Sequence, residues 1–276
     1  MTLRIIYEPK GRAREYAPLA VSLYRGCPHG CTYCFVPEST KTKVEKFLQP
    51  YPRKDALSLL AKDCEDLVLA GDTREILMSF TTDPYQPLDE ECKLTRSAIQ
   101  ILTLSARPFS ILTKGGRRST RDFDLMATRP DLCRYATTLT CSNLATEKKW
   151  EPNAAPWQER IKALEEAHRL GIKTWVSIEP VIDPEQSLAL ISMTHALGCV
   201  DQYRIGMLNH ETLPFPRVAL YDFVKKVSAI LADTDHIFKK DLQQYLRTAA
   251  FMAGIARDLE ADINSGMTRE ERGGLP

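Results

Sequence analysis

Long apolar runs are missing from this sequence of 276 residues. None of its apolar stretches approaches the roughly 18–20 residues that a helix needs to cross a bilayer. Residues 1–16 also lack the apolar stretch and cleavage site of a signal peptide. We therefore expect a cytoplasmic protein, in a compartment where thiols are kept reduced.

The sequence has almost no excess of charge of either sign, since 37 basic residues face 36 acidic ones and the net charge is +1. No global electrostatic field draws such a protein to nucleic acid or to an anionic membrane, so either contact requires a local patch. Internal repeats and low-complexity segments are absent as well. The composition, 43% hydrophobic and 26% charged, is that of an ordinary globular enzyme.

Short apolar strands alternate with amphipathic helices along most of the chain. We expect strands at 19–24, 75–80, 109–113, 135–140, 172–178 and 202–206, and helices at 54–69, 90–105, from 121, 156–171 and 184–198. Six strand–helix units predict parallel strands joined by right-handed crossovers, and so an α/β barrel or a doubly wound sheet.

The same pattern divides the chain into four segments. An N-terminal extension (1–16) precedes the α/β core (17–210), and C-terminal helices follow (211–265). The last residues (266–276) are polar and glycine-rich, and we expect them to be disordered.

Several expected strands end in polar residues, among them Asp83, Lys114, Ser142 and Glu179. Ligands bind at the carboxyl ends of the strands in parallel α/β folds. We therefore expect these side chains to gather on one rim, together with the segment that follows the first strand.

That segment, residues 25–35, reads RGCPHGCTYCF and contains Cys27, Cys31 and Cys34. A structural zinc site needs four ligands, and no second CxxC or CxxH pair completes one around His29. A disulfide conflicts with a reducing compartment and leaves one thiol over. An iron–sulfur cluster suits soft thiolates in a tight loop, and three ligands leave one iron of a four-iron cluster open. The residues favour the cluster among these three alternatives.

The spacing C-x3-C-x2-C, with Tyr33 before the third cysteine, resembles the signature of the radical S-adenosylmethionine (SAM) enzymes. Further segments, in order between about residues 20 and 245, resemble the spore-photoproduct-lyase-like branch of that superfamily: TTDPYQPLDE, ILTKGGRRSTRDFDLM, EPNAAPWQERIKAL and IEPVIDP. The resemblance implies a partial TIM barrel, a (β/α)6 core with a C-terminal helical extension.

The resemblance also implies the cofactors. Cys27, Cys31 and Cys34 would hold a [4Fe-4S] cluster, and SAM would bind its open iron. Reductive cleavage of SAM would give a 5′-deoxyadenosyl radical that abstracts hydrogen from a substrate. A low-potential electron donor of the flavodoxin or ferredoxin type is the implied partner, because such clusters work at low potential.

Roles for other residues follow from the same resemblance. Tyr33 would pack near the adenine, Asp83 would contact the SAM amino group, and Lys114 would face the carboxylate or ribose. Ser142 would contact SAM, and Glu179 would end a strand that borders the adenine. A second group, matching the family's EP…R pattern, would fix the loop by an ion pair or touch the ribose: Glu151 and Arg160. Each residue also has a structural interpretation, as a core aromatic, a turn aspartate, a solvated lysine or a strand end.

The substrate is not determined by the sequence. The best-known activity of the resembled family is a carbon–carbon lyase reaction that repairs a thymine photoproduct in DNA with a cysteine hydrogen donor, and no cysteine stands at a matching place. Strand alternation directs Cys141 away from Ser142.

The basic stretch 107–121 favours a phosphate-bearing substrate, since its cations are not offset by any acidic residue: Arg107, Lys114, Arg117, Arg118 and Arg121. A protein, peptide or small metabolite is the alternative substrate, and a non-catalytic metal-binding scaffold is the alternative class.

Overall fold

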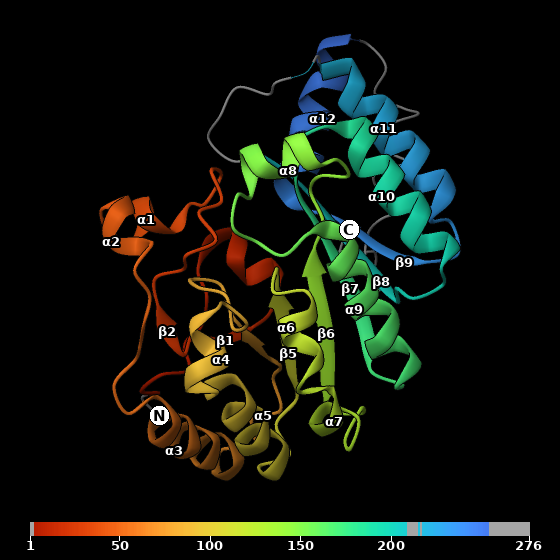
Figure 1. Ribbon diagram of the computed structural model, residues 1–276. Helices are drawn as coiled ribbons and strands as arrows, with labels where there is room; N and C mark the ends of the chain where they lie inside the picture. Colours follow the sequence, from red (N-terminus) through yellow and green to blue (C-terminus); the bar gives the residue numbers. More distant parts are fainter. Residues whose placement is uncertain (1–2, 209–214, 216, 254–276) are drawn as a thin grey trace. The chain divides into compact units, whose positions relative to one another are not determined.

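The computed structural model describes residues 3–208, 215 and 217–253, which divide into two compact units (Figure 1). The first unit comprises the described residues up to Thr137 together with Lys148–Lys173. The second comprises Thr138–Glu147 and the described residues from Thr174 onward. The expected tail at 266–276 lies outside the described residues.

The first unit is built on four parallel strands in the order β1-β4-β5-β6. Register pairs Leu19 with Ile76, Ile76 with Phe109, and Phe109 with Cys133. The strands are β1 (Leu19–Val21), β4 (Ile76–Met78), β5 (Phe109–Thr113) and β6 (Cys133–Thr138). Residues of β1 and β4 are buried without alternation, as in parallel strands covered on both faces.

Helices follow these strands in the first unit. Their main members are α3 (Ala56–Leu69), α5 (Leu94–Leu104) and α9 (Trp157–Arg169). Shorter elements complete the unit: η1 (Gly11–Glu15), α1 (Val36–Ser39), α2 (Val44–Phe47), α4 (Leu88–Cys92), α6 (Arg117–Thr120) and α7 (Phe123–Met126). Helix α8 (Leu144–Trp150) begins in the second unit and ends in the first.

The second unit contains three parallel strands in the order β7-β8-β9. Its elements are β7 (Lys173–Val181), α10 (Pro184–Ala196), β8 (Gln202–Met207), α11 (Arg217–Ile230), β9 (Asp235–Phe238) and α12 (Lys240–Ala253). The α/β class with parallel strands, predicted from the sequence, is confirmed. None of the helices within 3–208 and 217–253 combines the length and the apolar character that crossing a bilayer requires.

Three local expectations differ from the structure. The strand expected at 19–24 ends at Val21, and β2 (Tyr24–Arg25) instead pairs antiparallel with β3 (Tyr51–Pro52). The helix expected at 90–105 is two helices, because Lys93 takes a left-handed conformation with φ of 51°. The region expected to be wholly helical after residue 210 contains β9, in which buried His236 and Phe238 alternate with more exposed neighbours.

Asp63, on α3, fastens the N-terminal segment to the first unit. Its buried carboxylate accepts the backbone N–H groups of Arg4, Ile5 and Ile6 at 2.7–2.9 Å. Asp63→Ala should lower the free energy of unfolding by about 2 kcal/mol or more, because these buried donors lose their acceptor. Urea denaturation measures the loss. Asp66→Ala on the same helix removes only an exposed ion pair with Arg4 and should change little; equal losses would contradict the assignment.

Candidate metal centre and cofactor site

The three clustered cysteines lie in the loop between β2 and α1. Two glycines in this loop have positive φ, Gly26 at 80° and Gly30 at 66°. A Cβ on Gly26 would stand 2.5 Å from the carbonyl oxygen of Phe47. That same oxygen accepts the backbone N–H of Cys27 at 2.9 Å. The loop therefore packs directly on the C-terminal end of α2, and only glycine fits at position 26.

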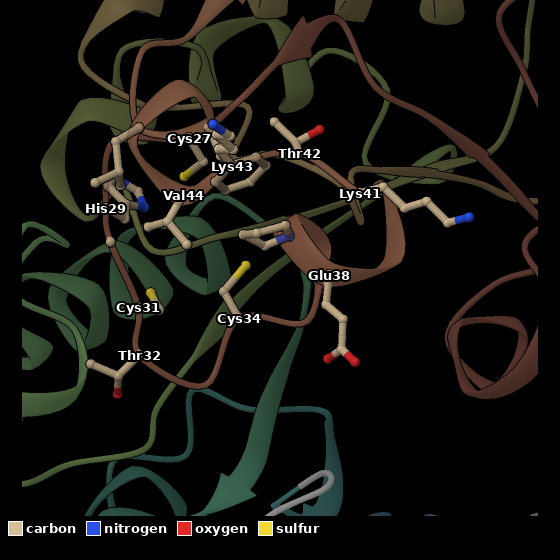
Figure 2. A pocket seen from close by; sticks show the side chains of 14 residues that line it. Cys27, His29, Cys31, Thr32, Cys34, Glu38, Lys41, Thr42, Lys43 and Val44 are labelled. Carbon is tan, nitrogen blue, oxygen red and sulfur yellow. The ribbon is translucent and has the colours of Figure 1, made fainter.

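All three cysteines line one cavity of about 750 Å³ (Figure 2). The loop also contributes His29, Gly30 and Thr32 to its wall. The opposite wall comes from α1, α2 and their connection: Pro37, Glu38, Lys41, Thr42, Lys43, Val44, Phe47 and Leu48. The first unit thus holds a chamber bordered by three free thiols.

Burial sets the protonation of these thiols. It raises the pKa of Cys27 well above its usual range, raises that of Cys31 to about 12, and also raises that of Cys34. At neutral pH the three side chains are therefore protonated thiols when no metal is bound. A coordinated metal displaces such protons, because a metal-bound thiol is deprotonated outright.

Three thiols are a donor set that suits an iron–sulfur cluster, whose irons take soft ligands. No three histidine, cysteine or carboxylate side chains converge on one ion position among the residues that the structure describes. A cubane cluster places each thiolate on a different iron, so its ligands surround a volume rather than a point. Cys27, Cys31 and Cys34 border such a volume.

Tyr33, Glu151, Arg160 and Lys114, all predicted from the sequence as site residues, lie together in the first unit. The Tyr33 hydroxyl donates to Glu151 Oε1, and Arg160 Nη1 donates to Glu151 Oε2 at 2.6 Å. The Lys114 ammonium lies 5.5 Å from the centre of the Tyr33 ring. One polar cluster thus joins the cysteine loop, α9 and the residues directly after β5 and α8.

Glu151 is ionised within this cluster. Its burial disfavours the charge, but the cations of Arg160 and Lys114 and the hydrogen bonds from Tyr33 and Arg160 hold its pKa below the ordinary value. Arg160 and Glu151 are both fully buried. The ion pair expected between them is present, and it ties α9 to the cysteine loop through Tyr33.

Asp83 ties the end of β4 to the end of β5. Its carboxylate accepts Thr113 Oγ1 at 2.6 Å, the backbone N–H of Lys114 at 2.7 Å and that of Tyr85 at 2.9 Å. His29 Nδ1 lies 3.6 Å from Asp83 Oδ2, the oxygen that accepts the Lys114 N–H. These partners are typical of a turn aspartate that connects two strand ends, which is the structural interpretation given for Asp83 from the sequence.

His29 and Asn153 are site residues whose roles the sequence does not reveal. Burial lowers the pKa of His29 to about 4, so the ring is neutral. Its Nε2 accepts Arg118 Nη2 at 3.2 Å, and we assign the ring proton to Nδ1, beside Asp83. The Asn153 amide donates to the Pro28 carbonyl at 3.0 Å and its backbone N–H to the His29 carbonyl at 3.1 Å.

The basic stretch 107–121 is less available to phosphate than its composition indicates. Arg107 donates to the Asp72 carbonyl, Arg118 donates to the Tyr85 carbonyl, and Arg121 pairs with Asp89. The glycine pair within the stretch also has a packing reason. A Cβ on Gly115 would stand 2.5 Å from Tyr85 Cβ, and Gly116 has φ of 54°. Three of the five cations therefore already have partners inside the protein.

Ser142 and Glu179 belong to the second unit. The backbone N–H of Ser142 donates to Gln186 Oε1 at 3.0 Å, and Glu179 pairs with Lys239 at 2.8 Å. A Cβ on Gly206 would stand 2.8 Å from Glu179 Cδ, so the glycine makes room for this carboxylate.

Cys141 lies outside a strand, because β6 ends at Thr138. The alternation of side chains along a strand therefore does not set the direction of Cys141. Its side chain is nevertheless buried.

Comparison with known proteins identifies the class. Residues 21–195, more than half of the chain, match the family model of the radical SAM superfamily. The chain therefore belongs to the radical SAM superfamily.

Among solved structures, the chain is similar to a spore photoproduct lyase variant with bound AdoMet and dinucleoside spore photoproduct. The TM-score is 0.60 at 13% identity, over 84% of this chain and 65% of that one. It is also similar to Streptococcus suis SuiB bound to S-adenosylmethionine, with a TM-score of 0.55 at 11% identity, over 78% of this chain and 44% of that one. These likenesses show the radical SAM fold. The chain spans less than two thirds of either protein.

Among curated proteins, an uncharacterised protein of Methanocaldococcus jannaschii is 26% identical over 211 residues, which are 75% of this chain and 71% of the relative. An uncharacterised protein of Mycobacterium tuberculosis is 27% identical over 172 residues, 59% of this chain and 49% of the relative.

The buried ion pair gives a stability prediction. Arg160→Met should lower the free energy of unfolding by about 3 kcal/mol or more, because it leaves the Glu151 carboxylate buried without its main cation. The double variant Glu151→Gln with Arg160→Met removes both charges and should be more stable than Arg160→Met alone. Urea denaturation of the four proteins in this cycle measures the coupling. Simple additivity of the two single losses would show that the pair is not coupled.

The lowered pKa of Glu151 gives a prediction for pH dependence. Because the folded pKa lies below the unfolded value of about 4.3, ionisation stabilises the folded protein above that pH, and this stability is lost as the pH falls through the folded pKa. Glu151→Gln lacks this contribution. Urea midpoints from about pH 7 to about pH 3 should therefore fall more steeply for the wild type than for the variant. Parallel curves would contradict the assignment.

Proposed function

We propose that this protein is a radical SAM enzyme that binds a [4Fe-4S] cluster and SAM. The observation that carries the proposal is the placement of Cys27, Cys31 and Cys34 around one cavity, inside the segment that matches the superfamily. When bound, the cluster would supply one electron to the sulfonium of SAM and so yield methionine and a 5′-deoxyadenosyl radical that takes hydrogen from a substrate. We also propose a cytoplasmic location, where the thiols stay reduced.

The chain's own residues would bind and orient these groups. Cys27, Cys31 and Cys34 would lose their protons and ligate three irons. Lys114 supplies a cation beside Tyr33, suited to the SAM carboxylate or ribose. Glu151 and Arg160 would hold Tyr33 at its place next to the loop. Asp83 would stabilise the strand ends or meet the SAM amino group. Ser142 and Glu179 are proposed as SAM contacts on the family resemblance alone.

For the substrate we propose a nucleic-acid lesion or modified base, converted in a lyase-like reaction of the DNA-repair type. The support is the fold shared with spore photoproduct lyase, whose structure includes a dinucleoside spore photoproduct. A peptide substrate is the second candidate, since SuiB has the same fold and was solved bound to a precursor peptide. Because Arg107, Arg118 and Arg121 have internal partners, the basic stretch 107–121 adds little support to the nucleic-acid proposal, which rests on the shared fold. Salt-sensitive DNA or RNA binding separates the two.

Anaerobic reconstitution with iron and sulfide, followed by dithionite and SAM, tests the proposed chemistry. Wild-type protein should turn brown and form 5′-deoxyadenosine, whereas Cys31→Ala should lose both properties, because one of the three cluster ligands is missing. The matched control is Cys92→Ala, which removes a thiol on α4 and should retain both. Product formation by Cys31→Ala would overturn the ligand assignment. A colourless wild type, or a brown one without product, would favour the non-catalytic scaffold.

A further inference from the structure

Two arginines share one face of the short ribbon that β2 and β3 form in the first unit. Arg25 lies opposite Tyr51 in the register of this ribbon. The ribbon continues to Arg53, whose backbone N–H donates to the Leu23 carbonyl at 2.9 Å. Residues two apart on an extended strand point to the same face, so Arg53 shares the face of Tyr51 and of Arg25.

These two arginines lack an acidic partner. Arg53 is half-buried, and its Nη1 donates to the Ser22 carbonyl at 3.3 Å. Within the described part of the chain, no carboxylate forms an ion pair with Arg53 or Arg25. Burial and the charge of Arg25 lower the pKa of Arg53. Other arginines of the first unit do pair with carboxylates: Arg4, Arg74, Arg96, Arg121, Arg129 and Arg160.

The Tyr7 hydroxyl reaches the same place from the N-terminal segment, whose backbone bridges to β1. This oxygen is buried near Ser22 and Thr81, which bond each other at 2.8 Å, and it has no hydrogen-bond partner among the described residues. Burial raises the pKa of Tyr7, while the charges of Arg53 and Arg25 oppose that rise. A buried hydroxyl without a partner costs stability, and a bound acceptor removes this cost.

The place lies at the carboxyl ends of two parallel strands. Ser22 follows β1 directly, and Thr81 comes shortly after the end of β4. Ligands of α/β folds bind at such strand ends. We call the five residues the anion cluster, and none of them lines the cavity of the three thiols: Tyr7, Ser22, Arg25, Arg53 and Thr81.

We propose that the anion cluster binds a phosphate group of the substrate, with Arg25 and Arg53 as its charge partners and Tyr7 as a hydroxyl donor. This proposal rests on the proposed function, because the phosphate would hold a substrate at the strand ends. A phosphate has more acceptor oxygens than a carboxylate, so two guanidinium groups and a hydroxyl can bind it together. The phosphate contact then comes from the ribbon and the N-terminal segment instead of the stretch 107–121.

Unfolding in urea separates a ligand site from a structural contact. Inorganic phosphate should raise the urea midpoint of the wild type above that in potassium chloride of equal ionic strength, because it binds the folded state. Arg53→Met should lose this increase, since one charge partner is missing. The same increase in both proteins would overturn the site.

Equilibrium dialysis measures binding to the reconstituted full-length protein with SAM present, using inorganic phosphate and a thymidine dinucleotide. Arg53→Met should weaken binding about tenfold or more, because a charge-assisted hydrogen bond is lost, and Tyr7→Phe about threefold or more. The matched control is Arg117→Met, which removes an exposed cation of the stretch 107–121 and should leave binding unchanged. Binding of the dinucleotide identifies a phosphodiester, and binding of inorganic phosphate alone identifies a monoester; either supports the site.

Three results would overturn the anion cluster: a loss confined to Arg117→Met, equal binding of acetate, or wild-type protein that binds neither phosphate probe. The proposed function has a separate readout. Wild-type protein that binds phosphate but forms no 5′-deoxyadenosine with dithionite and SAM would overturn that function and leave the site in place. Product formation without phosphate binding would overturn the site alone.

Discussion

The arrangement of the site depends on the interactions of one buried carboxylate, that of Glu151, with Arg160 and Tyr33. A carboxylate without water stays ionised only where cations and hydrogen-bond donors surround it. Here Arg160 supplies the cation from α9, and Tyr33 supplies the hydroxyl from the cysteine loop. One charge therefore couples a helix of the first unit to a loop that has no regular secondary structure of its own.

A second polar group holds the same loop at a different point. Neutral His29 lies between Arg118 and Asp83, and Asp83 in turn binds the backbone of Lys114 at the end of β5. Asn153 adds two hydrogen bonds to the loop backbone. Together these contacts fix the cysteines from residues more than fifty positions away in the sequence. The short apolar strands provide the frame, and the polar contacts provide the position.

The sequence predicts well those features that depend on neighbouring residues, such as the apolar strands, and less well those that depend on distant polar contacts. The strand at 109–113 was predicted with its exact bounds, because an apolar run between a proline and a glycine pair is a local signal. The cysteine spacing and the Glu151–Arg160 pattern predict the loop and its ion pair. Helices α1 and α2 give no such signal, since four residues are too few to show a helical periodicity. The basic stretch 107–121 misleads because the partners of Arg107 and Arg121 lie more than thirty residues away.

The environment of the thiols also distinguishes between two kinds of cysteine chemistry. A nucleophilic cysteine needs a lowered pKa, which neighbouring cations or a helix N-terminus usually provide. At Cys31 burial raises the pKa, and the charge of Lys114 offsets this effect only in part. Free thiolates are therefore suppressed in this loop, and coordination by a metal is the state in which all three sulfurs lose their protons. The burial that makes the cysteines poor nucleophiles is thus compatible with their use as cluster ligands.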